Sequence, residues 1–438
     1  MTDHLLMARS TMAFSLGFHI IFAAVGMVMP FFMFASQVSF TRRKNYHDLQ
    51  LTNMWSKGVA VIFATGAVSG TVLSFELGLL WPGFMKHAGP IIGMPFSWEG
   101  TAFFLEAIAL GIFLYGRGKL PVWAHTLSGL VVGVAGLASG IFIVSANSWM
   151  NTPAGFDWVN GAAINVDPVK AMFNKHWLQQ SVHMALASFE AVGFAVAGIH
   201  ALFYLKGKNK ALNISAIHIS LTFAAIAALL QPISGHFSAQ QVAKNQPVKL
   251  AAMESHFETE KGASLVIGGI PDTESRTIQG AIRLPKLLSF LAFNDFSAEV
   301  KGLNDFPREE WPPVLIVHLA FQLMVALGSL LMVIGAVFFF LRWRKKSLPR
   351  WFLKTLVCAI PMGFLALEAG WVVTEVGRQP WIVYGIMKTA DAVTPMPGIG
   401  FHFVLFLLVY LFTATLCVFL LYRLMVHTQK GAEEVSRG

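Results

Sequence analysis

Residues 312–341 read PPVLIVHLAFQLMVALGSLLMVIGAVFFFL and contain no Asp, Glu, Lys or Arg. About 20 mostly apolar residues are enough for a helix to cross the hydrocarbon core of a bilayer. A helix on the surface of a soluble protein would instead keep a polar face toward water. This stretch therefore predicts a membrane-spanning helix, and it decides the fold class of the chain.

Eight further stretches of the 438-residue chain are long and apolar enough to do the same. Charged residues make up only 13% of the chain, against about 25% in an ordinary soluble protein. We therefore predict an all-α integral membrane protein with about nine transmembrane helices. The expected spans are 11–38, 55–80, 97–116, 121–147, 177–205, 212–233, 312–341, 351–374 and 399–426.

One long gap, residues 234–311, separates the sixth span from the seventh and holds 10 of the 23 acidic residues. It is too long to be a simple connection, so we expect a loop outside the membrane. The chain then divides into helices 1–6 over residues 1–233, this loop over 234–311, and helices 7–9 with a short tail over 312–438.

Basic residues cluster in alternate short loops, which predicts the orientation because loops rich in Lys and Arg stay on the cytoplasmic side. These residues are Arg42, Arg43, Lys44, Arg117, Lys119, Lys206, Lys208, Lys210, Arg342, Arg344, Lys345, Lys346, Arg423 and Lys430. We expect the N-terminus and the long loop outside, and the C-terminus inside. Much of the net charge of +9 then marks topology, and no nucleic-acid partner is expected.

Ionisable side chains inside a membrane are costly and therefore mark candidate functional sites. Those within or at the ends of the expected spans are His19, Glu76, Glu99, Glu106, His183, Glu190, His200, His218, His318, Glu368 and Glu375. With the predicted topology, five potential iron ligands share a depth near the outer face: His19, Glu99, His183, Met324 and Glu375. His and Met are recurrent axial ligands of heme iron. Taken singly, each His or Glu could equally be a structural residue with one hydrogen bond.

Three pairs of these residues are spaced seven apart, which is two helical turns, so each pair lies on one face of its helix. The pairs are Glu99 with Glu106, His183 with Glu190, and Glu368 with Glu375. In each pair one group lies in the outer layer and the other lies deeper. This arrangement suits a ligand followed by a proton-relay group.

Four motifs resemble subunit I of the cytochrome bd-type quinol oxidases. They are GWVVTEVGRQPW at 370–381, NSWMNTP at 147–153, EGTAFFLE at 99–106 and KLAAME at 249–254. The first motif is highly specific, and the nine spans with one large loop extend the resemblance over nearly the whole chain. The loop is similar to that of the short-loop group, which includes the cyanide-insensitive oxidases.

The resemblance implies an enzyme of the bacterial cytoplasmic (inner) membrane that oxidises membrane quinol at the outer face and reduces O2 to water. Protons for water would come from the inside, so charge separates across the membrane without a proton pump. The implied hemes are a low-spin heme b, a high-spin heme b, and a third that is heme d or a further heme b. A second membrane subunit is implied as partner, and small single-span subunits stay open.

The resemblance also implies heme ligands, residue by residue. His183 and Met324 match the axial ligands of the low-spin heme. His19 matches the ligand of one high-spin heme, with Glu99 beside the same iron, and Glu375 matches the ligand of the other. Which of the two high-spin hemes each group holds stays open.

Five further residues match positions of the family that handle protons, quinol or heme. Glu106 matches a proton-delivery carboxyl, and Lys249 and Glu254 match the quinol-site pair of the loop. Glu254 can accept a proton as quinol is oxidised, while Lys249 can pair with it or hold a quinone oxygen. Arg378 and Trp371 match residues near the hemes, where an Arg can neutralise a propionate.

One departure from the family is Gln322, two residues before Met324, where many members have Arg. A neutral amide makes the surroundings of the low-spin heme less electropositive, which predicts a lower potential. His318, one turn earlier, is a candidate substitute as propionate partner. Two other classes stay open from the residues alone: a heme-free proton-coupled membrane transporter, and a b-type anchor that passes quinol electrons to another protein.

Overall fold

The computed structural model describes the backbone of residues 2–435 and the side chains of residues 4–429, so the side chain of Lys430 lies outside the described residues. Within this part, nine helical segments are long and apolar enough to cross a membrane, which confirms the predicted fold class. They are α1 (Thr2–Arg43), α2 (Tyr46–Leu80), α3 (Pro82–Tyr115), α4 (Val122–Asn151), α6 (Trp177–Leu205), α7 (Lys210–Asn245), α10 (Val314–Trp343), α11 (Arg350–Cys358) continued by α12 (Met362–Val376), and α14 (Ile399–Val435).

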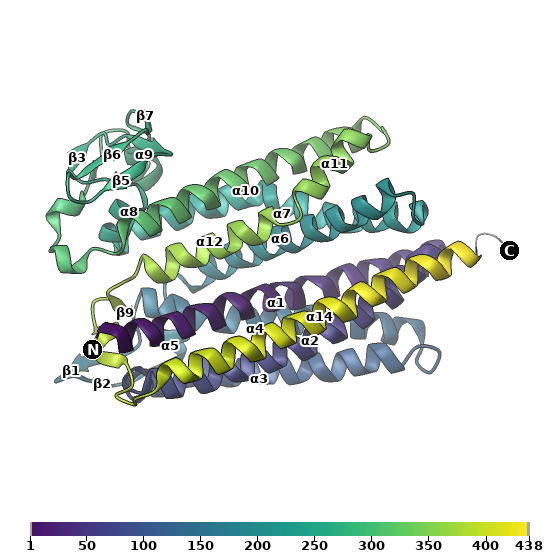
Figure 1. Ribbon diagram of the computed structural model, residues 1–438, viewed down its shortest axis with the longest axis horizontal. Helices are drawn as coiled ribbons and strands as arrows, with labels where there is room; N and C mark the ends of the chain where they lie inside the picture. The colour runs from purple at the N-terminus through teal and green to yellow at the C-terminus, as the bar shows by residue number, and fades with distance from the viewer. Residues whose placement is uncertain (1, 436–438) are drawn as a thin grey trace.

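The long helices run roughly side by side in one bundle (Figure 1). One half contains α1 to α4 with α14, and the other contains α6, α7, α10, α11 and α12. The halves meet where α6 packs against α1 and α4. The beginning of α1 and the segment between α7 and α10 lie at one end of the bundle, here called the loop end. The last turns of α14 lie at the other, here called the C-terminal end.

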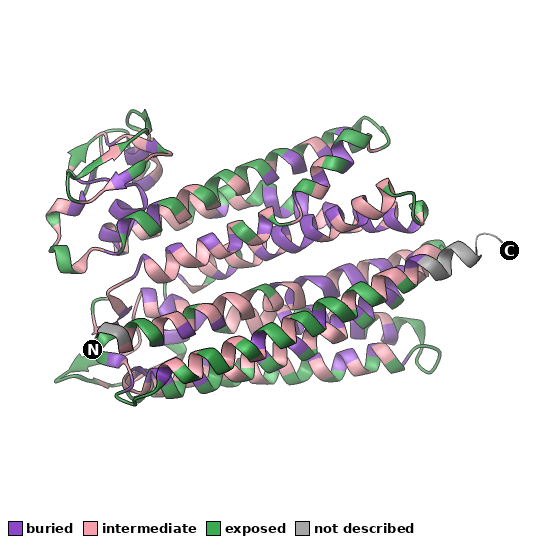
Figure 2. Ribbon diagram, viewed as in Figure 1, coloured by how far each residue is buried: buried purple, intermediate pink, exposed green. Residues whose placement is uncertain are grey.

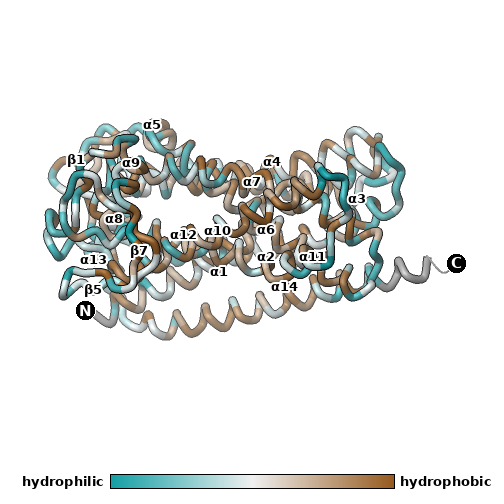
Figure 3. Tube along the Cα trace, turned by 90° about the horizontal axis from the view of Figure 1, so that it is seen from above, coloured by the Kyte–Doolittle hydropathy of each residue, from teal (hydrophilic) through white to brown (hydrophobic). Residues whose placement is uncertain are grey.

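The basic clusters of the alternate connections all lie at the C-terminal end, because they join α1 to α2, α3 to α4, α6 to α7 and α10 to α11. Figure 3 shows a hydrophobic middle between two more hydrophilic ends. This is the distribution that a bilayer requires, since the helix middles lie in hydrocarbon and the ends in the polar interface.

The outward faces of the bundle are apolar rather than polar. On α14, Phe401, Phe412 and Val418 are 72%, 70% and 64% exposed, and much of this helix lies open to its surroundings (Figure 2). Exposed apolar surface of this extent is typical of helices that contact lipid or another membrane subunit.

Several helix boundaries differ from the sequence prediction. α3 begins at Pro82 rather than at 97 and runs through Pro90 and Pro95. Residues 234–245, predicted as the start of the long loop, continue helix α7. The eighth span is broken between α11 and α12 beside Pro361, which has no N–H to donate within a helix.

The long loop, residues 246–313, folds into short elements at the loop end. They are α8 (Pro247–Met253), β3 (Glu260–Lys261), β4 (Leu265–Ile267), β5 (Ile270–Asp272), β6 (Thr277–Gln279), β7 (Ile282–Leu284), α9 (Leu287–Phe293), β8 (Glu299–Val300) and the 3-10 turns Leu303–Asp305 and Arg308–Glu310. The strands pair antiparallel as β3 with β8, β4 with β7 and β5 with β6. An apolar cluster containing Val248, Val317 and Val373 joins the loop to α10 and α12.

Two shorter connections complete the loop end. Between α4 and α6 lie β1 (Asp157–Val159), its antiparallel partner β2 (Ala162–Ile164) and α5 (Pro168–Met172). Between α12 and α14 lie β9 (Trp381–Val383), its partner β10 (Met387–Lys388) and α13 (Thr389–Ala392).

Helix α6 approaches its neighbours closely through small residues. A Cβ atom on Gly363 of α12 would lie 2.4 Å from the Cα atom of Ala191 on α6. A Cβ atom on Gly198 of α6 would lie 2.3 Å from the carbonyl oxygen of Leu356 on α11. Close backbone approach at small residues is how membrane helices gain packing energy where no hydrophobic effect drives association.

We predict that Gly363→Ala lowers stability by about 1–3 kcal/mol, the usual cost of overpacking a tight contact. The measurement is the thermal unfolding midpoint of the purified protein in detergent. Gly111→Ala on α3 is the matched control, because a Cβ atom there meets nothing within 4 Å. An equal midpoint for the two variants would contradict the packing argument.

Candidate functional site

An ion pair at the loop end joins two residues of the GWVVTEVGRQPW motif. Arg378 Nη2 donates to Glu375 Oε2 at 2.6 Å, and the Arg378 side chain is only 2% exposed. The other carboxylate oxygen of Glu375 accepts a hydrogen bond from Asn147 Nδ2 at the end of α4. Two motifs that are more than 200 residues apart therefore meet at Glu375.

Asn151 extends this contact to the long loop. Its Nδ2 donates to Asn147 Oδ1 at 3.1 Å, and its Oδ1 accepts from Lys249 Nζ at 2.9 Å. Gln246 Nε2 donates to the carbonyl oxygen of Asn151 at 2.7 Å. One chain of hydrogen bonds thus runs from Arg378 through Glu375, Asn147 and Asn151 to Lys249.

Lys249 is buried at the junction of α4, α8 and α12. Besides Asn151, its ammonium donates to the carbonyl oxygen of Thr374 at 3.3 Å. Gly377 leaves room for its stem, since a Cβ atom there would lie 3.1 Å from Lys249 Cγ. Burial and, to a smaller extent, the positive charge of Arg378 lower the pKa of Lys249 to about 7, although the negative charge of Glu375 opposes the shift.

Glu254, which follows α8, is also buried, with 2% of its surface exposed. Its Oε2 accepts a hydrogen bond from the backbone N–H of Val266 at 3.4 Å. Burial raises the pKa of Glu254 to about 8, and the Val266 hydrogen bond opposes that rise. Among the described residues no ion pair joins Glu254 to Lys249, so the pairing that the sequence allowed is not present.

His19 on α1 faces Ser69 on α2, with 2.9 Å between His19 Nδ1 and Ser69 Oγ. The Ser69 hydroxyl donates to backbone carbonyls of its own helix, at Thr65 and Gly66. It therefore accepts from Nδ1–H of His19, which leaves the lone pair of Nε2 for a ligand. In histidines that bind metals, the ring nitrogen that does not bind the metal typically donates such a hydrogen bond, which fixes the tautomer.

His183 and Met324 lie on different helices and have different neighbours. His183 Nδ1 lies 3.1 Å from Ser234 Oγ of α7, and Gln231 Nε2 lies 3.4 Å from His183 Nε2. Met324 of α10 faces α12, where a Cβ atom on Gly370 would lie 3.1 Å from its sulfur atom.

Glu99 and Glu106, which are predicted to share one face of their helix, both face α4. Ser139 Oγ donates to Glu99 Oε1 at 3.2 Å, and a Cβ atom on Gly136 would lie 3.2 Å from Glu106 Oε2. An apolar groove of about 560 Å3 between α3 and α4, lined in part by Trp98, runs along the same helices.

The other intramembrane acids also lie inside the bundle. Glu190 is buried, and neither its Oε1 nor Glu368 Oε1 has a hydrogen-bond partner. Glu368 of α12 faces α1, since a Cβ atom on Gly17 would lie 3.4 Å from its Oε2. Trp371 is half-buried against the apolar core of the bundle.

The donor atoms at the loop end fit a heme with acidic side groups. Arg378 Nε and Nη1 are buried without a hydrogen-bond partner. A heme propionate would supply acceptor oxygens for both nitrogens. Among the described residues no group of three or more His, Cys, Asp or Glu side chains could hold a bare metal ion. Single His, Met or Glu side chains would suit heme iron, since a porphyrin provides the remaining donors.

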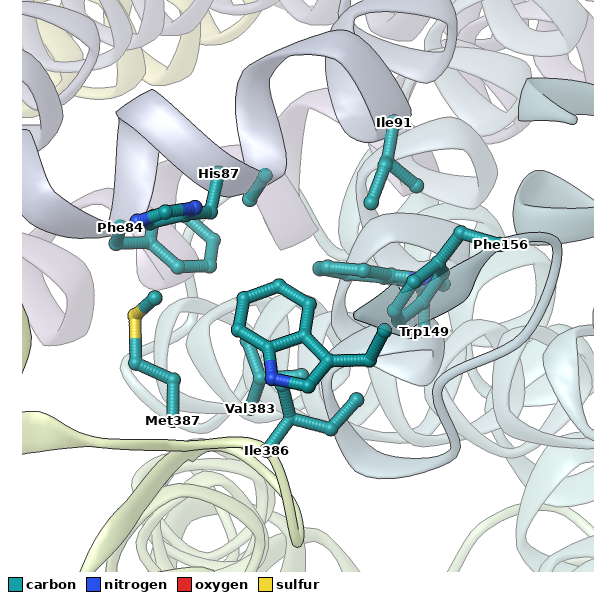
Figure 4. Close-up of a pocket in the computed structure, with 10 residues that line it drawn as sticks. Phe84, His87, Ile91, Trp149, Phe156, Val383, Ile386 and Met387 are labelled. Carbon is teal, nitrogen blue, oxygen red and sulfur yellow. The ribbon is translucent and has the colours of Figure 1, made fainter. Parts of the chain in front are cut away.

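A small pocket at the loop end does not belong to this site (Figure 4). It has a volume of about 10 Å3 and is lined mostly by apolar side chains, including Phe84, Trp149 and Val383. A volume near that of one water molecule cannot hold a porphyrin or a quinone ring.

The sequence missed several residues of the site. Asn147 and Asn151 belong to a motif that carries the family resemblance, but the sequence gives neither of them a partner. Ser69 and Ser234 gave no signal, because a hydroxyl on a helix usually bonds its own backbone. Their contacts to His19 and His183 depend on which helices are neighbours.

The fold and site together define a class: a multi-pass helical membrane protein whose half-buried His, Met and Glu side chains suit heme iron. A family model described as cytochrome bd terminal oxidase subunit I matches residues 7–429. The chain therefore belongs to the cytochrome bd terminal oxidase subunit I family, whose members are subunits of quinol:O2 oxidoreductases. Membership in this family excludes the two alternative function classes, the heme-free transporter and the b-type anchor.

Individual relatives agree with this family. A Bacillus subtilis protein named as a cytochrome bd menaquinol oxidase subunit I is 37% identical, with 96% of each chain covered. A cytochrome bd ubiquinol oxidase subunit 1 of the same organism is 30% identical over 98% of this chain and 95% of its own. The solved bd oxidase from Geobacillus thermodenitrificans superposes with a TM-score of 0.91 at 36% identity, covering 97% of this chain and 99% of that chain.

We predict that Asn151→Leu destabilises the protein by about 1–3 kcal/mol, because Lys249 and Gln246 lose a buried acceptor. Thermal unfolding in detergent measures the effect. Asn53→Leu is the control, since this side chain is exposed on α2. If both variants have the unfolding midpoint of the wild type, Asn151 does not stabilise the hydrogen-bond network.

Proposed function

We propose that this chain is the catalytic subunit of a terminal quinol oxidase that oxidises membrane quinol at the loop end and reduces O2 to water at a high-spin di-heme site. The observation that carries the proposal is the continuous hydrogen-bond chain from Lys249, a candidate quinol-site residue, to Glu375, a candidate heme ligand. Electron donor and acceptor sites joined in this way lie within a short distance of each other.

His183 and Met324 would hold a low-spin heme b. His19 with Glu99 would hold one high-spin heme and Glu375 the other, one being heme b and the other heme d or a further heme b. The bound hemes supply one-electron transfer and O2 binding. The free Nε2 lone pair of His19 supports the assignment of that residue, and the unpartnered nitrogens of Arg378 support its contact with a propionate.

Quinol oxidation releases protons as well as electrons, and Glu254 would accept one of these protons. The carboxylate form is the acceptor, and its buried position places it away from bulk water. Lys249 would donate a hydrogen bond to a quinol or quinone oxygen through its third N–H, since Asn151 and Thr374 use the other two.

Protons for water would travel through the membrane from the opposite end of the bundle. Glu106 lies two turns from Glu99 on one face of α3 and would deliver them, with Glu190 and Glu368 as further carriers. With the loop end outside and the C-terminal end inside, as the basic clusters indicate, consuming inner protons and releasing outer ones separates charge without a pump.

The membrane would be the bacterial cytoplasmic membrane. The relatives named as subunit I or subunit 1 imply a second subunit in the working enzyme. The exposed apolar faces of the bundle offer the surface that a second membrane subunit requires.

We predict that His183→Ala and Met324→Leu each abolish the low-spin heme signal in a reduced-minus-oxidised spectrum, because each removes a side chain that would hold this heme. The protein should still be expressed and membrane-inserted. His218→Ala is the control, as His218 on α7 packs against Phe338 and is no ligand candidate. A normal low-spin spectrum in either variant would refute the ligand assignment.

We predict that kcat/KM for quinol rises with pH on the acid side of neutrality, by up to about tenfold per pH unit. With the pKa of Glu254 at about 8, the carboxylate that accepts protons becomes more abundant as pH increases. The rise should end near pH 7, because Lys249 then begins to lose its ammonium proton.

Glu254→Gln should lower kcat/KM and flatten the acid limb while all hemes are retained. Glu258→Gln is the matched control, because Glu258 is an exposed acid of the same loop. An unchanged pH profile in Glu254→Gln would count against Glu254 as the proton acceptor.

A further inference from the structure

Two side chains of α10 point at the long loop rather than at another helix. His318 and Gln322 are four residues apart and so lie one above the other on the same helix face. His318 is fully buried. Gln322 bonds the backbone of β4 and of the turn that follows it, whereas His318 contacts carbonyl oxygens of that turn and of α8.

Gln322 forms two hydrogen bonds with one strand edge. Its Nε2 donates to the carbonyl oxygen of Val266 at 3.0 Å, and its Oε1 accepts from the backbone N–H of Gly268 at 2.9 Å. One amide thus serves a donor and an acceptor two residues apart, as a neighbouring strand would.

His318 holds the same turn from the adjacent helical position. Its Nε2 lies 3.2 Å from the carbonyl oxygen of Gly268, and its Nδ1 lies 2.8 Å from the carbonyl oxygen of Met253. Both ring nitrogens therefore face loop carbonyls. The sequence hypothesis that His318 is a partner of a heme propionate stays a prediction, and the observed partners of His318 are the carbonyl oxygens of Met253 and Gly268.

The turn owes its shape to two glycines. Gly268 and Gly269 have φ values of +69° and +93°, a left-handed backbone that other residues rarely adopt. A Cβ atom on Gly269 would lie 2.8 Å from the Cβ atom of Ala281. This conformation turns both the N–H and the carbonyl of Gly268 toward α10.

These contacts close a ring around Glu254. Val266 donates its N–H to Glu254 and accepts at its carbonyl from Gln322, while His318 holds Met253, the residue before Glu254. Within residues 2–435, β4 pairs with no strand other than β7, so its second edge would otherwise be unpaired. Gln322 and Glu254 occupy that edge.

We propose that Gln322, supported by His318, is a positioning residue for quinol oxidation: it clamps β4 onto α10 and thereby fixes the strand that orients the Glu254 carboxyl. This inference rests on the proposed function of Glu254 as proton acceptor. The clamp needs both halves of a neutral amide, because Arg has no acceptor for the Gly268 N–H and Glu has no donor for the Val266 carbonyl.

The clamp is tested by amide hydrogen exchange of the complete oxidase in detergent, followed in peptides that contain residues 266–268. In Gln322→Leu, the Gly268 amide loses its acceptor and should exchange about three- to tenfold faster, the effect of one lost hydrogen bond. Gln322→Arg should behave alike, whereas Gln322→Glu keeps an oxygen for Gly268 and should retain protection. Leu319→Ala is the control, since Leu319 is exposed on α10.

The positioning role is tested by quinol kinetics of the same variants, with the heme spectrum as a second readout. Gln322→Leu should lower kcat/KM for quinol about three- to tenfold while the low-spin heme spectrum stays normal. If Gln322→Leu fails to assemble, Gln322→Arg and Gln322→Glu provide the same comparison. Both variants should have a lower kcat/KM for quinol than the wild type.

Three results would overturn the inference. Unchanged exchange at Gly268 in Gln322→Leu would show that the clamp does not exist. Faster exchange with unchanged quinol kinetics would show that it positions nothing, provided that Glu254→Gln does slow the enzyme. If Glu254→Gln leaves quinol kinetics unchanged as well, the proposed role of Glu254 fails, and the positioning role fails with it.

Discussion

The structure depends on one constraint: a bilayer offers no water to hydrogen-bond a peptide group. Every span must therefore satisfy its own backbone, which makes each of them a helix and reserves strands for the loop end. Polar side chains in the helices are then few and must find partners on neighbouring helices. The contacts of His19 with Ser69, of His183 with Ser234 and of Glu99 with Ser139 are of this kind.

At the loop end, the charged side chains of Glu375 and Lys249 find partners in the side-chain amides of two asparagines. Asn147 and Asn151 separate the Glu375–Arg378 ion pair from the Lys249 ammonium and bond to both sides. An amide both donates and accepts, so it can link charged groups without adding a further buried charge. The two ends of this chain are the residues that we propose for quinol and heme.

The long loop is attached to the bundle in two ways. Its apolar cluster packs against Val317 and Val373, and its free strand edge is occupied by Gln322 from α10. An unpaired edge is otherwise a site for unwanted pairing. Because Gln322 is two residues from Met324, the loop that would bind quinol and the helix that would hold the low-spin heme share one rigid contact. The lower heme potential expected from Gln322 stays a prediction.

The sequence by itself determined the nine spans, the one long loop and the family, because hydrophobic length and contiguous motifs are local properties of the chain. It also predicted that Glu99 and Glu106 share a helix face, since that follows from seven-residue spacing. Only the tertiary structure decided the partners: Lys249 bonds Asn151 instead of Glu254, Gln322 bonds strand β4, and His318 contacts the turn after that strand. Those contacts depend on which helices and loop segments are neighbours in space, and no local pattern carries that information.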